Sequence, residues 1–203
     1  MKRITAYCRL KEDYCAVNGA EVARRDLASS DSWFKQIYKE QGFVYPKFYK
    51  MDSLSQAGYL ASELIKRANP DFATNYEDDE IALVFANSVS STDTDLRFIK
   101  SYEGSDSPSP SVFVYTLPNI VLGEIAILNK WYGENMFAVL PKFAPGFFLN
   151  YLQVIGSTGA KAALCGWLEV LEGSIDVLLF LVEESGTDSL ELNAENLLNL
   201  SLT

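Results

Sequence analysis

Apolar residues recur along this chain in two patterns, one typical of helices and one typical of buried strands. Spacings of three and four residues predict a helix over residues 53–68. Ser53, with Gln56 three positions later, predicts a capping box at the start of this helix, and Asn69-Pro70 predicts its end. The apolar stripe of this helix is expected to face a core.

Short apolar runs closed by polar turns predict the strands. They lie at residues 4–8, 81–86, 136–140, 161–168 and 175–182, with a further short strand expected at 112–115. Other helices are expected at 118–130, 144–157 and 190–200, from the loop 88–95 to Tyr102, and as short polar pieces within 20–41. The alternation predicts an α/β fold with a largely parallel sheet, which a final hairpin turns into a mixed one.

The absence of histidine is the most informative feature of the composition. None of the 203 residues is histidine, which excludes Ser-His-Asp and Cys-His catalysis and imidazole metal sites. Cys8, Cys15 and Cys165 form no Cys-x-x-Cys pair, and we interpret them as reduced thiols of a cytoplasmic protein. No apolar stretch approaches the roughly 20 residues that a membrane span requires.

Acidic residues outnumber basic ones by 27 to 17, so the formal net charge is −10. This balance argues against a nucleic-acid partner, because phosphates bind basic surfaces. No basic residue follows Lys161, which predicts either a solvated acidic face or a surface for a basic partner. Asp93, Asp95 and the acidic turn 77–80 are expected to cap helices and face solvent, so we predict no metal and no cofactor.

Four passages of the chain carry an ordered set of motifs, and they cover residues 47–69, 81–95, 114–135 and 163–184. The third is the most specific, with Pro118-Asn119, then Gly123 and Ala126, then Gly133-Glu134-Asn135. Over residues 45–184 the chain thus resembles the N-terminal half of the β-ketoacyl synthases, the condensing enzymes of fatty-acid and polyketide synthesis. The resemblance implies a thiolase-like half-fold, a βαβαβαββ unit with a mixed five-stranded sheet and helices packed on it. We expect one such domain over residues 1–203, with 185–203 as an acidic tail or helix.

The chain departs from this family where the family carries its chemistry. The family strand after Gly-Pro-Asn ends in Thr-Ala-Cys, and the cysteine takes up the acyl chain. Here residues 139–144 contain no Cys, Ser or Thr, and Lys142, followed by Phe143, stands nearest the nucleophile position. The family's second half, which carries the catalytic histidines, has no counterpart in this sequence. The resemblance therefore implies no condensing activity from this chain alone.

The same resemblance implies a protein partner. The strand 136–140 corresponds to the one that pairs across the two-fold axis of family dimers. The helix at 144–157 is apolar on nearly every side and must be buried, so one apolar face is expected to stay open for a partner. The candidate interface comprises Met136, Phe137, Val139, Phe147 and Phe148. The expected partner is a full-length ketosynthase or a second copy of this chain.

Three functions remain open on the sequence. The first is a non-catalytic accessory subunit, similar to a chain length factor, that partners a ketosynthase in fatty-acid or polyketide-type biosynthesis. The second is a homodimeric module that binds an acyl chain or an acyl carrier protein, through the basic residues Arg24, Arg25, Lys35, Lys39, Lys47 and Lys50. The third is an atypical acyltransferase that acts through Lys142 or Cys165.

Overall fold

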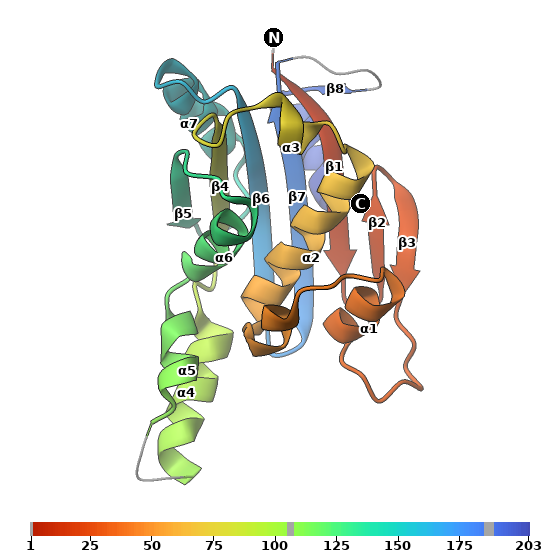
Figure 1. Ribbon diagram of the computed structural model, residues 1–203, viewed down its shortest axis with the longest axis vertical. Coiled ribbons are helices and arrows are strands. Elements are labelled where there is room, and N and C mark those ends of the chain that lie inside the picture. Colours follow the sequence, from red (N-terminus) through yellow and green to blue (C-terminus); the bar gives the residue numbers. More distant parts are fainter. Residues whose placement is uncertain (1, 105–107, 185–188) are drawn as a thin grey trace.

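The computed structural model describes residues 2–104, 108–184 and 189–203. Its eight strands form one mixed sheet with helices on both faces (Figure 1). The strands are β1 (Arg3–Lys11), β2 (Tyr14–Val17), β3 (Ala20–Arg24), β4 (Ile81–Asn87), β5 (Asn135–Val139), β6 (Ala162–Leu171), β7 (Ser174–Glu183) and β8 (Leu190–Glu191). They are ordered β3-β2-β1-β7-β6-β4-β5, with β8 paired to β1.

The predicted α/β fold is confirmed, but the predicted count of five strands is wrong. The five expected strands are present side by side as β5, β4, β6, β7 and β1, with β4 parallel to both β5 and β6. The other three strands are the hairpin β2–β3, which extends the sheet beyond β1, and the short β8. The hairpin turns at Asn18-Gly19, both with positive φ, the dipeptide that two-residue hairpin turns favour. Part of residues 20–41, expected to be helical, is therefore strand β3.

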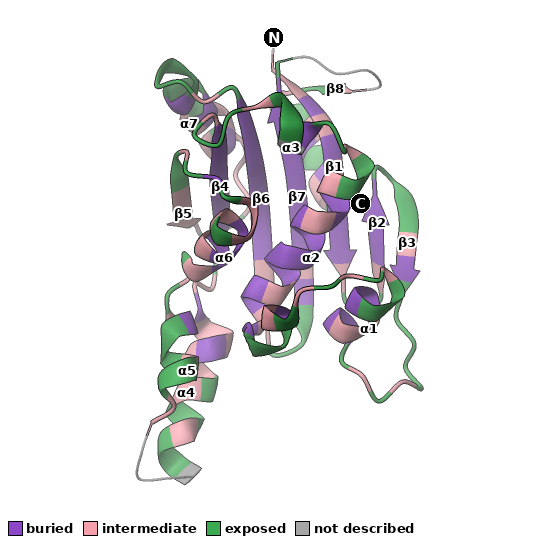
Figure 2. Cartoon of the chain, in the orientation of Figure 1, coloured by how far each residue is buried: buried purple, intermediate pink, exposed green. Residues whose placement is uncertain are grey.

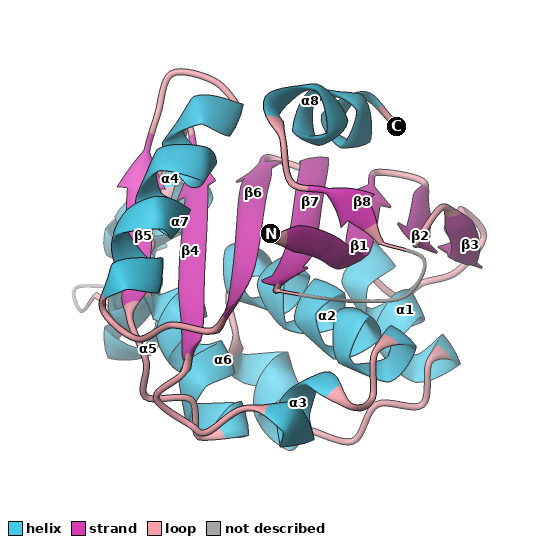
Figure 3. Cartoon of the chain, turned by 90° about the horizontal axis from the view of Figure 1, so that it is seen from above, coloured by secondary structure: helices cyan, strands magenta, loops and turns pink. Residues whose placement is uncertain are grey.

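Two helical layers cover the sheet. The helices are α1 (Trp33–Glu40), α2 (Ser53–Ala68), α3 (Phe72–Asn75), α4 (Thr92–Gly104), α5 (Pro110–Phe113), α6 (Ile120–Asn129), α7 (Pro145–Ser157) and α8 (Ala194–Leu202), with the 3-10 turns η1 (Pro46–Lys50) and η2 (Val114–Thr116). One core joins the sheet to α1, α2, α3 and α6, and a second core joins the opposite face to α7 and α8. Figure 3 shows α2 and α8 on opposite sides of the strands.

The central strands are buried on both faces because helices cover both. Every residue of β4 is buried, as expected for a parallel strand enclosed by two layers. Figure 2 shows the same for most of β6 and β7, whereas β5, at one edge, is half-buried or exposed throughout. The sheet is thus rigid at its centre and accessible at the β5 edge.

Helix α2 packs against the sheet, and a side-chain cap fixes its N-terminus. Its cap is Asp52, whose carboxylate accepts a hydrogen bond of 2.9 Å from the Ser55 backbone N–H, rather than the predicted Ser53. Asp52 also accepts a 2.8 Å hydrogen bond from the Thr94 hydroxyl, which ties α2 to α4. Asp52, one residue before the predicted cap Ser53, therefore caps α2 and also links it to α4.

The close approach of α2 to α6 requires glycine at position 58. A Cβ at Gly58 would lie 2.4 Å from Val121 Cγ2 and 3.2 Å from Leu168 Cδ2. We therefore expect Gly58→Ala to lower the free energy of unfolding by about 1–3 kcal/mol, although alanine is favoured by about 1 kcal/mol in a helix. Urea unfolding followed by circular dichroism measures this. The control is Gly123→Ala in α6, where a Cβ meets nothing within 4 Å; it should be neutral or stabilising. Equal effects of the two changes would contradict this packing.

The structure corrects one local prediction and bears on a second. Residues 112–115 were expected as a strand but form the end of α5 and the 3-10 turn η2, because Pro110 sits in the first turn and the Ser109 side chain caps the helix. Helix α7 was expected to be apolar on nearly every side and to leave one apolar face open. It buries Phe148, Leu152 and Ile155 but leaves Val154 59% exposed, because a single helical layer covers this face.

An arm of two helices, α4 and α5, projects from the body of the molecule (Figure 1). Phe98 packs against Tyr102 and Phe113 in this arm, with ring centroids 5.1 and 5.4 Å apart. Tyr102 and Phe113 remain exposed. Taken alone, none of the helices described has the length and apolarity of a membrane span; the pair Pro110–Thr116 and Ile120–Asn129 reaches both only in combination, across a 98° bend.

Candidate functional site

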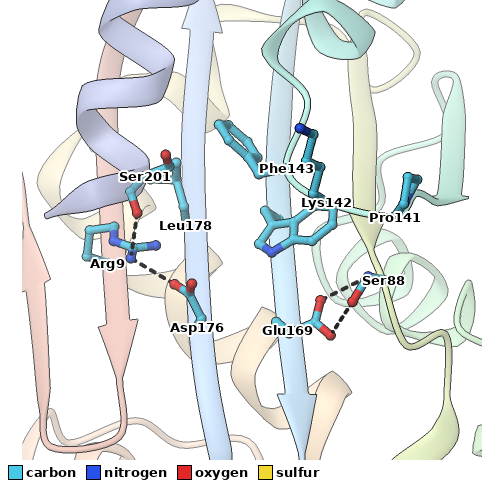
Figure 4. A pocket seen from close by; sticks show the side chains of 10 residues that line it. Arg9, Ser88, Pro141, Lys142, Phe143, Glu169, Asp176, Leu178 and Ser201 are labelled. Carbon is cyan, nitrogen blue, oxygen red and sulfur yellow. Dashed lines mark hydrogen bonds and ion pairs between the residues drawn. The ribbon is translucent and has the colours of Figure 1, made fainter.

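A pocket of about 360 Å³ opens at the carboxyl ends of the parallel strands (Figure 4). Ligands of open α/β sheets commonly bind at this edge. The lining residues come from the three strands β1, β6 and β7, the loops after β4 and β5, and the last turn of α8; they are Arg9, Ser88, Pro141, Lys142, Phe143, Trp167, Glu169, Asp176, Leu178 and Ser201.

The floor of the pocket is set by strand register. Trp167 pairs with Leu178, and Leu178 with Arg9, so one row crosses β6, β7 and β1. In the next row Glu169 pairs with Asp176, and Asp176 with Lys11. The first row is therefore apolar apart from Arg9 at one end, and the second row is charged throughout.

The two carboxylates of the pocket are both engaged by neighbours. Asp176 Oδ1 accepts from Arg9 Nη2 at 2.8 Å and from Lys11 Nζ at 2.9 Å. Partial burial raises the pKa of Asp176, but the hydrogen bonds and charges of Lys11 and Arg9 outweigh it and hold that pKa below its usual value. Glu169 accepts from the Ser88 backbone N–H and hydroxyl, at 2.9 and 2.8 Å.

Lys142 and Phe143, proposed from the sequence as the nucleophile position, both line this pocket. They lie in the loop between β5 and α7, directly before the helix N-terminus. Lys142 is exposed at the rim, whereas Phe143 is half-buried with its ring 6.0 Å from Trp167 in an edge-to-face contact. This loop, residues 140–144, holds no Cys, Ser or Thr.

Cys165 lies inside β6, fully buried, and burial raises the pKa of its thiol well above the usual range. Cys8 and Cys15 are also buried, with Sγ atoms 3.8 Å apart; their mutual hydrogen bond, followed by burial, raises the pKa of Cys8. All three thiols are packed as small apolar groups in the core, and the raised pKa values of Cys8 and Cys165 disfavour their thiolate forms.

We therefore expect all three thiols to resist labelling in the folded protein. With Ellman's reagent at pH 8, labelling should be at least about a hundredfold slower than in the chain unfolded by guanidinium chloride, because all three thiols are buried. The absorbance of the released dye measures the rate. Rapid labelling of a single thiol in the native protein would identify a reactive cysteine and restore the acyltransferase hypothesis.

Strand β5 ends the sheet and has a free edge. Leu83 N–H donates to the Glu134 carbonyl and Leu140 N–H donates to the Asn87 carbonyl, both at 2.8 Å. Since parallel ladders alternate, residues 134, 136, 138 and 140 bond to β4, and Asn135, Phe137 and Val139 direct their backbone groups outward. Val139 is 54% exposed.

The other members of the candidate interface differ in exposure. Met136, Phe137 and Phe147 are half-buried. Phe148 is 0% exposed and packs against Phe180, with ring centroids 5.4 Å apart, so it belongs to the chain's own core. We therefore remove Phe148 from the candidate interface and keep Met136, Phe137, Val139 and Phe147.

The basic residues considered for a carrier protein are partly neutralised. Arg24 pairs with Glu21 and Asp13. Lys47 Nζ lies 2.7 Å from Oε2 of the buried Glu124, which also accepts a 2.9 Å hydrogen bond from the Tyr115 hydroxyl. Lys39 pairs with Asp31. Arg25 and Lys50 are exposed and form no ion pair with any residue that the structure describes.

Sequence reasoning missed most of the pocket. Arg9, Trp167, Glu169 and Asp176 come from three strands and meet only through their register. The available signal was a charged residue inside an otherwise apolar strand, as Asp176 is in β7 and Arg9 in β1. Such residues need a partner when buried, so each predicts a polar site.

Comparison with solved structures identifies the architecture. The ishigamide ketosynthase/chain length factor matches with a TM-score of 0.68 and 18% identity, over 91% of this chain and 62% of that one. The fold is that of the ketosynthases. A type II polyketide-synthase acyl-carrier protein in complex with its hexaketide-bound ketosynthase matches at 0.62 and 15%, over 90% and 62%. A ketosynthase with its chain length factor from Xenorhabdus doucetiae matches at 0.53 and 14%, over 71% and 63%.

This chain spans about three fifths of the length of the solved structures reported above. Neither the protein-family models nor the curated proteins include a match to it. The thiolase-like half-fold expected from the sequence is thus established by structure.

Proposed function

We propose that this chain is a non-catalytic ketosynthase-like subunit, similar in role to a chain length factor, that pairs with a full ketosynthase in fatty-acid or polyketide-type biosynthesis. The proposal is carried by one observation. On a ketosynthase fold, the loop that leads into α7 presents Lys142 and has no Cys, Ser or Thr. Covalent acyl transfer requires a nucleophile at a position activated by its surroundings, such as a helix N-terminus.

The composition supports the same proposal. The chain contains no histidine, so it cannot supply the imidazole acid–base group on which many acyl-transfer sites depend. Removal of a general acid or base alone costs about 10²–10⁴ in rate. We therefore assign the chemistry to the partner and a structural role to this chain.

Of the two edge strands of the sheet, β3 and β5, we favour β5 as the partner surface. The opposite edge strand, β3, carries Glu21 and Arg24, and charges on an edge discourage pairing with another chain. Strand β5, with the sequence Asn-Met-Phe-Ala-Val, carries no charge and directs three backbone N–H groups outward. Strand addition at this edge would join two chains through backbone hydrogen bonds and flanking apolar contacts.

A contact with an acyl carrier protein is the second part of the proposal. One of the structural relatives is a ketosynthase complex with such a carrier. Among the four basic residues singled out from the sequence, Lys50 and Arg25 are exposed and form no ion pair within the described chain, whereas Arg24 and Lys47 form ion pairs with acidic residues. We place this contact on Lys50 and Arg25, and the complex in the reducing cytoplasm, where the buried thiols stay reduced.

Affinity capture of the tagged chain from its own host tests the proposal. We expect a full-length ketosynthase in one-to-one ratio, identified by mass spectrometry. The purified complex should condense acyl and malonyl thioesters, whereas the isolated chain should not. A chain recovered alone as a stable homodimer would favour the acyl- or carrier-binding module instead. Condensing activity in the isolated chain would contradict both hypotheses.

A further inference from the structure

The wall of the pocket contains a guanidinium group that is almost fully buried. Arg9 is 2% exposed, and its Nη2 donates to Asp176 Oδ1 at 2.8 Å and to the Ser201 carbonyl at 3.2 Å. Its Nε is buried and has no hydrogen-bond partner within the described chain. A buried donor without an acceptor is costly, so an unsatisfied group of this kind calls for an explanation, and a bound acceptor is one.

Strand register fixes what lies beside this group. Arg9 shares a row with Leu178 and Trp167, so an apolar floor runs from the guanidinium across two strands. Phe143 stands over the far end of this floor, with its ring at 75° to the Trp167 indole. Figure 4 shows Arg9 at one side of the pocket and Ser88 and Pro141 at the other, with Phe143 between them.

The charges of the pocket favour an anion. Arg9, Lys11 and Lys142 lie in or beside it, against Asp176 and Glu169. Asp176 is already shared by Arg9 and Lys11, and Glu169 is held by Ser88, so neither carboxylate is left to pair with a ligand cation. The spare hydrogen-bonding capacity is therefore that of a buried cation, which suits a carboxylate.

We propose that this pocket binds a small aromatic carboxylate, with the carboxylate on Arg9 and the ring on the apolar floor formed by Leu178 and Trp167, beside Phe143. A volume of about 360 Å³ is at the small end of ligand pockets and accommodates a single ring with a short acid side chain. The site is independent of the proposed subunit role, because it is formed by this chain alone.

The experiment uses the wild-type chain and the indole N–H signals of its three tryptophans in NMR. Phenylacetate is the probe, 2-phenylethanol lacks its charge, and acetate lacks its ring. Phenylacetate should shift the Trp167 signal in a saturable way, and the other two compounds should bind at least about tenfold more weakly. Trp33 and Trp131 belong to the core on the opposite face and act as internal references.

Arg9→Gln should weaken phenylacetate binding at least about tenfold. The matched control is Lys11→Gln, which removes the other partner of Asp176 but no residue of the pocket wall; its affinity should stay within about threefold. If Arg9→Gln does not fold, the Arg9 Nε–H signal of the wild-type chain replaces it, and phenylacetate should shift that signal. Equal binding of 2-phenylethanol, equal binding of acetate, or no shift at Trp167 would overturn the proposal.

Discussion

Replacing Phe148 with alanine is expected to lower the free energy of unfolding by about 3–5 kcal/mol. Phe148 is 0% exposed and fastens α7 to the sheet. Its ring lies 5.4 Å from Phe180 and 5.7 Å from Phe143, so truncation leaves a cavity between aromatic side chains that cannot collapse. Urea unfolding followed by near-ultraviolet circular dichroism measures the loss.

The control for Phe148 is Val154→Ala on the same helix. Val154 is 59% exposed, so its truncation should change the free energy of unfolding by no more than about 0.5 kcal/mol. Comparing Phe148→Ala with Val154→Ala distinguishes a role of Phe148 in the core from a role at a partner interface. If Phe148→Ala left stability intact and abolished association with a partner, Phe148 would be an interface residue, as the sequence alone first indicated.

Val139→Pro is expected to weaken association with the ketosynthase partner at least about thirtyfold. Proline removes the outward N–H of Val139 and introduces a ring at the free edge of β5, while the inward bonds of Met136, Ala138 and Leu140 to β4 remain. Proline is tolerated on edge strands, so the isolated chain should keep its fold. Sedimentation of the mixture with the captured ketosynthase measures the affinity.

Two further variants complete the Val139 test. Val139→Thr keeps the β-branched shape and the backbone donor and should associate within about threefold of the wild type. Val154→Asp places a charge on the exposed side of α7 and should leave the affinity unchanged if β5 is the partner surface. Loss of association in Val154→Asp together with full retention in Val139→Pro would move the interface to the α7 face.

The sequence correctly predicted the helices and strands whose surroundings are the same along their whole length. Strands β4, β6 and β7 are apolar throughout because both faces are covered, and such runs are visible without any knowledge of their neighbours. Helix α2 was predicted to the residue over 53–68, since a single apolar stripe faces the sheet. The order of these strands and helices along the chain was enough to predict the α/β fold.

The elements that were missed depend on local turn chemistry. Asn18-Gly19 carried the signal for the β2–β3 hairpin, but the flanking strands have four and five residues and mixed polarity, so their pattern was weak. Residues 112–115 are β-prone in composition, yet the proline and serine just before them begin a helix. Capping and turn residues decided both cases against the apolar pattern.

The candidate site was likewise predicted only in part from the sequence. Lys142 and Phe143 were found because they lie in one loop, at a position that a family pattern marks. Arg9 and Asp176 are 167 residues apart, and a single sequence gives no register between their strands. A slip of one residue would reverse the face of each side chain, so this half of the pocket required the structure.

Hydrogen–deuterium exchange of the β5 amides, measured for the free chain and for its complex with the captured ketosynthase, tests the central claim most directly. In the free chain the amides of Met136, Ala138 and Leu140 should be protected by β4, and those of Asn135, Phe137 and Val139 should exchange rapidly. Complex formation should protect the outward-facing set. Unchanged exchange at these three amides, with new protection on α7 and α8 instead, would contradict pairing through β5.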